Sequence, residues 1–180
     1  VPPSWRPRRG AGNLSRSRHP GLRTQFDVFA PKTLGGSPRL LLYPNVHSPD
    51  GSTELARDAV SPDGQYFAYA LSKGGSDWRE IHLMRLSDLS AGADTVPWTK
   101  YSGISWTNDG RGFFYTRYPT PAPDSVLTAQ AINGKIFYHT VGTADSQDRL
   151  IYERPDRPDW FIRADVSEDG RFLSVTMNHG

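Results

Sequence analysis

The sequence contains no cysteine among its 180 residues, which excludes a disulfide framework and a thiolate metal site. It also lacks the run of about 18 apolar residues that a transmembrane helix needs, so we expect no membrane partner. A Gly-rich phosphate loop and a dinucleotide-binding fingerprint are missing, and no two histidines have the spacing of metal ligands. We therefore expect neither a cofactor nor a metal ion.

Acidic side chains are absent from residues 1–26, which hold six arginines. Residues 27–180 carry 15 basic and 19 acidic side chains, so the pI of about 9.0 comes from the N-terminal segment alone. A nucleic-acid partner would need a basic face on the folded body, and we expect none. Residues 1–25 are rich in Pro, Arg, Ser and Gly, which favours a disordered tail over the alternative of a transit peptide.

From residue 26 onward, short apolar runs alternate with turn residues, and this pattern predicts an all-β fold. Val, Ile, Tyr, Phe, Trp and Thr dominate the runs, as half-buried strands prefer. The expected strands are Phe26–Phe29, Arg39–Tyr43, Ala56–Val60, Gln65–Leu71, Glu80–Leu86, Ile104–Thr107, Gly112–Tyr118, Lys135–Val141, Arg149–Tyr152, Arg163–Val166 and Arg171–Thr176.

An internal repeat refines this prediction, because a Ser/Thr-x-Asp-Gly motif occurs at residues 61–64, 107–110 and 167–170. Asp and Gly tolerate the left-handed backbone of a tight hairpin, and the hydroxyl can bond the turn. The Asp-Gly pairs lie 46 and 60 residues apart, and one hairpin at such a period is typical of a propeller blade, a four-stranded meander. A β-sandwich also contains regular hairpins but predicts no such repeat, so we expect a β-propeller.

Several longer motifs resemble the N-terminal β-propeller of the prolyl oligopeptidase family of serine peptidases, over residues 26–180. The motifs are Tyr43–Asn45, Ser61–Ser72, Gly75–Trp78, Ser105–Tyr115, Lys135–Thr143 and Pro158–Trp160. The resemblance implies a seven-bladed propeller, of which this chain supplies about two and a half to three blades. These are the end of blade 1, blade 2 at about 52–98, blade 3 at about 101–155 and the start of blade 4. Tyr43 replaces the family's Asp, and residues 1–25 resemble nothing in the family.

The same resemblance implies that this chain is the substrate-gating part of a cytoplasmic serine-type endopeptidase that hydrolyses short peptides after proline. Its partners would be an α/β-hydrolase peptidase domain and short proline-containing peptides, and no catalytic residue is expected in this chain. Ser37 and Ser76 follow paired glycines but lack the trailing glycines of a nucleophile turn. A non-catalytic peptide- or protein-binding propeller and a truncated fragment without activity stay open as alternatives. A dipeptidyl-type peptidase is a third, weaker one.

Two positions have a functional interpretation by this resemblance. Tyr101 matches a family aromatic that points from the propeller toward substrate, where a flat apolar face suits a pyrrolidine ring. The alternative interpretation is that Tyr101 is a core aromatic of its blade. Asp77 matches a carboxylate at the interface with the peptidase domain, where it could pair with a cation. Its alternative is a surface acid beside Trp78.

Overall fold

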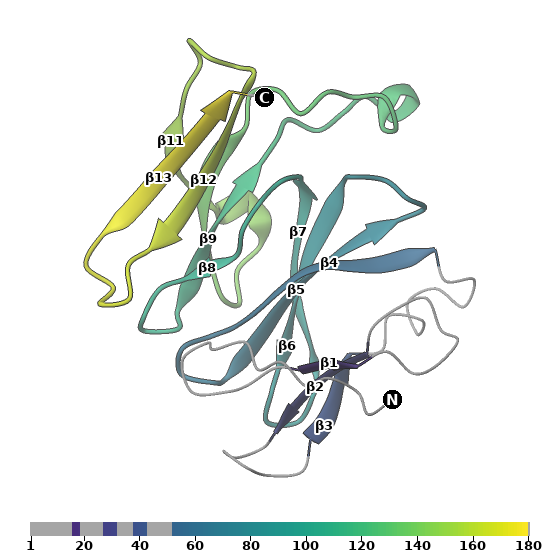
Figure 1. Cartoon of the computed structure of the whole chain (residues 1–180), viewed down its shortest axis with the longest axis vertical. Coiled ribbons are helices and arrows are strands. Elements are labelled where there is room, and N and C mark those ends of the chain that lie inside the picture. The colour runs from purple at the N-terminus through teal and green to yellow at the C-terminus, as the bar shows by residue number, and fades with distance from the viewer. Residues whose placement is uncertain (1–15, 19–26, 32–37, 43–51, 180) are drawn as a thin grey trace.

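The computed structural model describes residues 16–18, 27–31, 38–42 and 52–179, and these residues form an all-β fold (Figure 1). The strands are β1 Arg16–Arg18, β2 Asp27–Pro31, β3 Pro38–Leu42, β4 Thr53–Val60, β5 Tyr66–Lys73, β6 Arg79–Arg85, β7 Ala91–Thr99, β8 Ser105–Trp106, β9 Gly112–Arg117, β10 Lys135–Thr140, β11 Arg149–Glu153, β12 Trp160–Val166 and β13 Leu173–His179. Two single-turn 3₁₀ helices complete the described part, η2 Pro123–Ser125 and η3 Asp145–Gln147.

The strands form antiparallel sheets that follow one another along the chain. Strands β1–β3 form the first sheet, β4–β7 a four-stranded meander, β8–β11 a second meander and β12–β13 a hairpin. The two meanders are joined at one end by a single pair, Thr99 with Arg117. Successive meanders of this kind are part of a β-propeller, which confirms the predicted fold class. The numbering of individual blades stays a prediction.

Strand β5 explains why the sheets stack, because both of its faces are apolar. Phe67 and Tyr69 point to one face and share a core with Val28 of β2 and Leu41 of β3. Side chains alternate between faces along a strand, so the residues between them point to the opposite face. The first sheet therefore covers only one side of the β4–β7 meander.

The opposite face of β5 presents small side chains, Ala68 and Ala70, which leave room for large ones. Trp106, Phe113 and Tyr115 of the next meander fill this room, and Phe113 is 0% exposed. Such matching of small and large residues gives the close packing of protein interiors. The β8–β11 meander therefore completes the burial of the β4–β7 meander.

The same alternation recurs at the next interface along the chain. Phe114 points away from the side taken by Phe113 and packs near Ile136 of β10. Ile162 and Ala164 of β12 close this third core. Successive sheets are thus held together by apolar contacts between the faces that they share.

The three Ser/Thr-x-Asp-Gly motifs fold into the same turn, as their repetition predicts. The hydroxyls of Ser61, Thr107 and Ser167 donate to the aspartate two residues later, at 2.5, 2.6 and 2.6 Å. The same carboxylate oxygen accepts the backbone N–H of the residue after the glycine. The motif glycines have φ of 71°, 68° and 70°, the left-handed region that favours glycine.

These turns also pack against one another, which gives two of the glycines a second role. A Cβ at Gly110 would lie 2.6 Å from Oδ2 of Asp63 in the preceding turn. A Cβ at Gly170 would lie 2.7 Å from Cγ of Asn108, whose side-chain amide donates to the Glu168 carbonyl at 3.0 Å. The turns thus form a contact row at one end of the stacked sheets.

Two strands were not expected from the sequence. Strand β7 contains Ala, Gly, Asp and Pro, which lowers its β-propensity, yet it pairs with β6 and forms the last strand of its meander. Strand β1 lies within the segment expected to be a disordered tail, and its backbone pairs with β2. An edge strand can form by backbone pairing without apolar side chains of its own. The rest of residues 1–25 lies outside the described part.

Replacement of Gly110 by alanine should destabilise the protein more than replacement of Gly75 by alanine. Both positions have positive φ, which costs an alanine about 1–2 kcal/mol, but nothing lies within 4 Å of a Cβ at Gly75. The clash with Asp63 should add about 1–3 kcal/mol at Gly110. Urea unfolding of both variants measures the difference, and equal losses would contradict the packed-turn interpretation.

Candidate functional site

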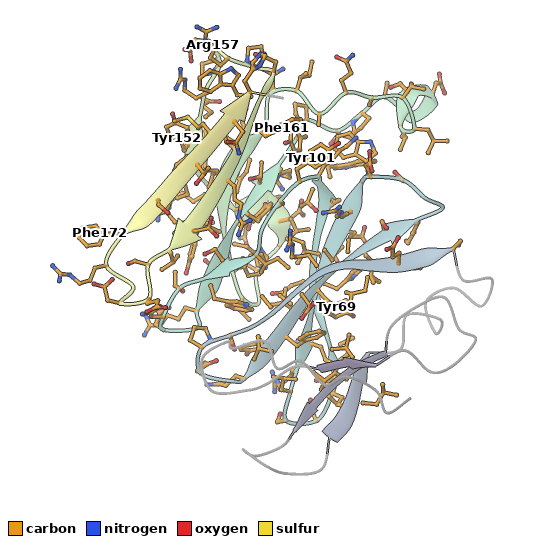
Figure 2. The ribbon with its side chains drawn as sticks, viewed as in Figure 1. Tyr69, Tyr101, Tyr152, Arg157, Phe161 and Phe172 are labelled. Atoms are coloured by element: carbon orange, nitrogen blue, oxygen red, sulfur yellow. The ribbon has the colours of Figure 1, made fainter. Side chains whose placement is uncertain are left out.

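Tyr101 is a half-exposed aromatic in the turn that follows β7. Its side chain is 49% exposed, and its ring centroid lies 4.8 Å from that of Phe161 at the start of β12, edge to face (Figure 2). Its φ of 53° is uncommon for a non-glycine residue and occurs often at functional sites. Tyr101 is therefore not a buried core aromatic, and together with Phe161 it presents an accessible aromatic surface.

Lys100 connects Tyr101 with Asp77, the other residue singled out in the sequence. Its Nζ lies 3.2 Å from Oδ2 of Asp77 and 5.4 Å from the centroid of the Tyr101 ring. The same ammonium lies 5.2 Å from the centroid of Trp78, within cation–π range. These residues and Phe161 are called the Lys100 cluster below. The structure thus brings the two expected residues together through a third, Lys100.

The ion pair in the Lys100 cluster is unevenly exposed, because the Lys100 side chain is 11% exposed and that of Asp77 is 63% exposed. A pair with one partner in solvent contributes little to stability, about 0–1 kcal/mol. Its effect is instead positional, since it holds the ammonium over two aromatic rings. Asp77 can still accept hydrogen bonds from outside the chain, and its pairing with a cation of another domain stays a prediction.

Trp78 gives the cluster a fixed base. Its side chain is 8% exposed and packs edge to face against Trp98 and Tyr118, at centroid distances of 6.0 and 5.9 Å. Its indole N–H donates to the carbonyl of Val126 at 2.7 Å, which attaches the segment after η2 to the sheet. The aromatic base is therefore held by both packing and a hydrogen bond.

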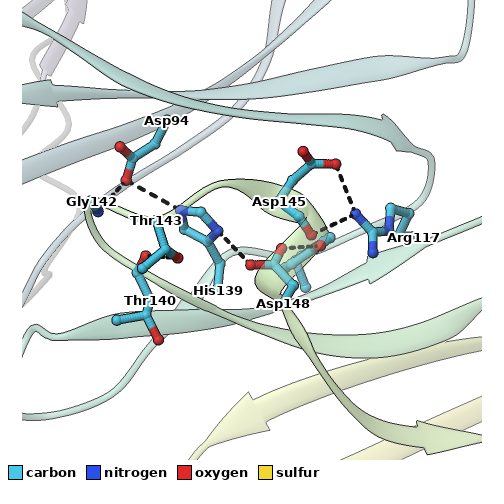
Figure 3. Close-up of polar contacts among 9 residues, drawn as sticks. Asp94, Arg117, His139, Thr140, Gly142, Thr143, Asp145 and Asp148 are labelled. Carbon is cyan, nitrogen blue, oxygen red and sulfur yellow. Dashed lines mark hydrogen bonds and ion pairs between the residues drawn. The ribbon is translucent and has the colours of Figure 1, made fainter.

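A second polar group lies inside the fold, between the two meanders (Figure 3). His139 of β10 is 0% exposed, and its ring nitrogens lie 2.8 Å from Asp148 and 3.2 Å from Asp94. Asp94 belongs to β7 and also accepts the backbone N–H of Gly142 at 2.6 Å. Tyr115 donates its hydroxyl to Asp148 at 2.6 Å. The imidazole therefore bonds one carboxylate of its own meander, Asp148, and one of the neighbouring meander, Asp94, which links the two meanders.

The charge of His139 follows from these contacts. Burial of the imidazole by itself lowers the pKa of His139, but hydrogen bonds and charge attraction from Asp148 and Asp94 outweigh it, and the pKa is raised. Burial also raises the pKa of Tyr115, and its bond to Asp148 adds to this, so the phenol stays protonated and donates. Two buried carboxylates next to one imidazole favour the imidazolium.

The described residues show no nucleophile with an adjacent base among the serines considered above. The Ser76 hydroxyl accepts the backbone N–H of Trp78 at 3.1 Å within the turn before β6, while Ser37 lies outside the described part. Among the described residues, no group of three or more His, Cys, Asp or Glu side chains is arranged so that it could hold a metal ion. None of the helices described is long and apolar enough to cross a membrane.

Sequence reasoning missed Lys100, Phe161 and the carboxylates around His139. Lys100 stands directly before Tyr101, so its proximity could have been noticed, although its orientation could not. Asp94 and Asp148 lie 45 and 9 residues from His139 and share no motif with it. Packing of the two meanders brings Asp94 to the imidazole, and the connection between β10 and β11 brings Asp148 to it.

A family model described as the prolyl oligopeptidase N-terminal β-propeller domain matches residues 16–180. The chain belongs to this family. The match begins ten residues before the position from which the motifs were recognised. The expectation that residues 1–25 resemble nothing in the family is therefore wrong for residues 16–25. The chain belongs to the propeller part of a prolyl oligopeptidase-like protein.

Relatives and solved structures agree with this assignment. The prolyl endopeptidase of Elizabethkingia meningoseptica is 37% identical over 160 residues, which cover 89% of this chain and 22% of the relative. Prolyl oligopeptidase A of Amanita bisporigera is 36% identical over 148 residues, covering 73% of this chain and 19% of the relative. The chain thus spans about a fifth of the length of these relatives.

Among solved structures, prolyl oligopeptidase B from Galerina marginata, bound to a 35mer hydrolysis and macrocyclization substrate, superposes with a TM-score of 0.81 at 31% identity. The alignment covers 93% of this chain and 26% of that chain. A prolyl endopeptidase structure from a study of inter-domain dynamics in catalysis and specificity gives a TM-score of 0.83 at 30% identity, covering 97% of this chain and 24% of that chain.

Loss of the His139 imidazole should change how stability depends on pH. Because the folded pKa is raised, its stabilising contribution is complete below the unfolded pKa of about 6.5 and is lost as pH rises through the folded value. Thermal midpoints of the protein should therefore fall as pH rises above about 6.5. His139→Gln should remove this fall and cost about 3–5 kcal/mol below that pH, since it leaves two buried carboxylates without a cation.

Asp94→Asn serves as the matched variant, because it keeps the size of the side chain and removes one of the charges that raise the pKa of His139. It should shift the fall in thermal midpoint to lower pH. The thermal midpoint of the wild type is compared with that of His139→Gln as pH increases beyond about 6.5. A wild-type midpoint that stays constant or increases relative to the variant would contradict an imidazolium at this position.

Proposed function

We propose that this chain belongs to the substrate-gating propeller of a serine-type endopeptidase that hydrolyses short peptides after proline. In this proposal the Ser-His-Asp triad belongs to an α/β-hydrolase peptidase domain outside these residues, and no cofactor takes part. The propeller caps the active site and excludes folded proteins. Membership of the prolyl oligopeptidase propeller family supports the proposal, and a cytoplasmic location is part of it.

The observation that carries the proposal is the half-exposed Tyr101 ring, fixed beside Phe161 and Lys100. A proline ring is compact, apolar and rigid, so an aromatic face can bind it with little loss of conformational entropy. Lys100 and Phe161 restrict the orientations that Tyr101 can adopt, which reduces the entropy that binding would cost. Asp77, on the exposed side of the cluster, is the group we assign to contact with the peptidase domain.

A non-catalytic peptide-binding propeller is the second candidate. It is favoured by the hydrogen bonding of Ser76, whose hydroxyl accepts a backbone N–H in a turn and has no described general base beside it. The two candidates differ in a simple measurement. Hydrolysis of a proline-containing chromogenic peptide, blocked by a serine-directed inhibitor, supports the peptidase, whereas binding without hydrolysis supports the binding module.

Tyr101→Ala should weaken recognition of proline peptides more than it weakens the fold. Loss of one aromatic contact costs about 0.5–1.5 kcal/mol, so KM should rise about two- to tenfold with kcat nearly unchanged. Steady-state kinetics of the protein at its full natural length measure this. Phe172→Ala is the control, because Phe172 is 65% exposed and lies at the far end of the β12–β13 hairpin (Figure 2).

The control should leave KM unchanged. If Tyr101→Ala lowers the unfolding free energy while KM stays at the wild-type value, Tyr101 serves the fold and the substrate assignment is wrong.

A further inference from the structure

A pocket of about 260 Å³ lies beside the Lys100 cluster. Trp78 and Trp98 form aromatic parts of its lining, and Val126 and Leu127 border it from the segment after η2. The indole hydrogen bond from Trp78 to Val126 keeps that segment in place. Drug-sized ligands occupy pockets of about 300–1,000 Å³, so this volume suits a single amino-acid residue.

Among the described residues, the charged groups that line the pocket are two cations and one acid. Arg79 of β6 lines it, and the guanidinium Nε is buried without a hydrogen-bond partner among the described residues. Glu80, the acid of the lining, is engaged elsewhere, because its Oε1 lies 2.9 Å from Nε2 of His82. Lys73 adds a second cation to the lining.

A buried donor without an acceptor is costly, and a carboxylate is the acceptor that a guanidinium binds best, through two parallel hydrogen bonds. The apolar part of the pocket and this cation together define a ligand with an apolar side chain next to a carboxylate. In the C-terminal residue of a peptide, both groups are bonded to the same Cα atom.

We propose that this pocket binds the C-terminal residue of a peptide, with its side chain against Trp78 and Trp98 and its carboxylate on Arg79. The inference rests on the proposed function in one respect, that peptides reach this surface. It adds a second contact beyond the Tyr101 surface, since Trp78 lines the pocket and also lies beneath Lys100. A free C-terminus would then be part of what the propeller selects.

The test uses N-acetyl-leucyl-phenylalanine and its C-terminal amide, titrated into the protein at its full natural length. Calorimetry measures affinity, and fluorescence of the pocket tryptophans reports the site. The acid should bind at least about tenfold more tightly than the amide, as expected for a hydrogen bond to a charged group. Equal binding of the two probes, or binding of neither because another segment of the protein fills the pocket, would overturn the proposal.

Arg79→Gln should abolish the preference for the acid and leave the affinity of the amide unchanged. Arg85→Gln is the control, because Arg85 is exposed on the same strand and does not line the pocket. Retention of the preference in Arg79→Gln would assign the carboxylate to another cation and contradict the proposal.

A second pair of variants tests the site even if Arg79→Gln fails to fold. Leu127 lines the pocket and is 82% exposed, so polar residues are tolerated there. Leu127→Glu should weaken binding of the acid more than binding of the amide, because its carboxylate repels that of the acid. Leu127→Gln should change the affinity of both probes equally. Equal effects of the Glu and Gln variants on the acid would count against the site.

These probes contain no proline, so their binding does not depend on cleavage. A protein that prefers the acid but hydrolyses no proline peptide contradicts the proposed function and leaves the pocket assignment intact. Hydrolysis of proline peptides without any preference for the acid contradicts the pocket assignment alone.

Discussion

The two apolar faces of β5 constrain the rest of the described fold, because a strand buried on both sides requires a sheet on each side. Phe67 and Tyr69 require β2 and β3, and the small Ala68 and Ala70 require the large aromatic residues of the next meander. Sheets stacked in this way bring their turns to two ends. The Ser/Thr-x-Asp-Gly turns lie at one end. The turns that carry Asp77, Lys100 and Tyr101 lie at the other end, near Phe161 at the start of β12. The candidate site is thus a consequence of the stacking.

Apolar contacts allow small shifts between sheets, whereas polar contacts have narrow geometry. The buried imidazole of His139 bonds two carboxylates, one of which belongs to the neighbouring meander, and this fixes how β7 and β10 lie against each other. In the row of turns, the contact of Gly110 with Asp63 limits the distance between successive turns. Such precision matters for the site. The Lys100 cluster is built from the turn before β6, the turn after β7 and the start of β12, so a shift of one sheet would separate Tyr101 from Phe161.

Local patterns made much of the fold predictable. The hairpins follow from Ser61, Asp63 and their repeats, since the turn is formed by neighbouring residues. Strand β7 was missed because its Ala, Gly and Asp residues have low β-propensity, and pairing with β6 overrides this preference. Tyr101 and Asp77 were found only through family resemblance. Their connection through Lys100, and the carboxylates of His139, depend on packing between distant segments that no local pattern records.

The central claim is that a proline peptide contacts the Lys100 cluster of the propeller, and photo-crosslinking tests it most directly. A short proline-containing peptide with a benzophenone next to the proline would be irradiated with the protein at its full natural length, and the product mapped by mass spectrometry. The account predicts crosslinks to the segment from Trp98 to Gly103 or to Phe161, which excess unlabelled peptide removes. Crosslinks confined to the outer residues of β13, or none that unlabelled peptide removes, would contradict it.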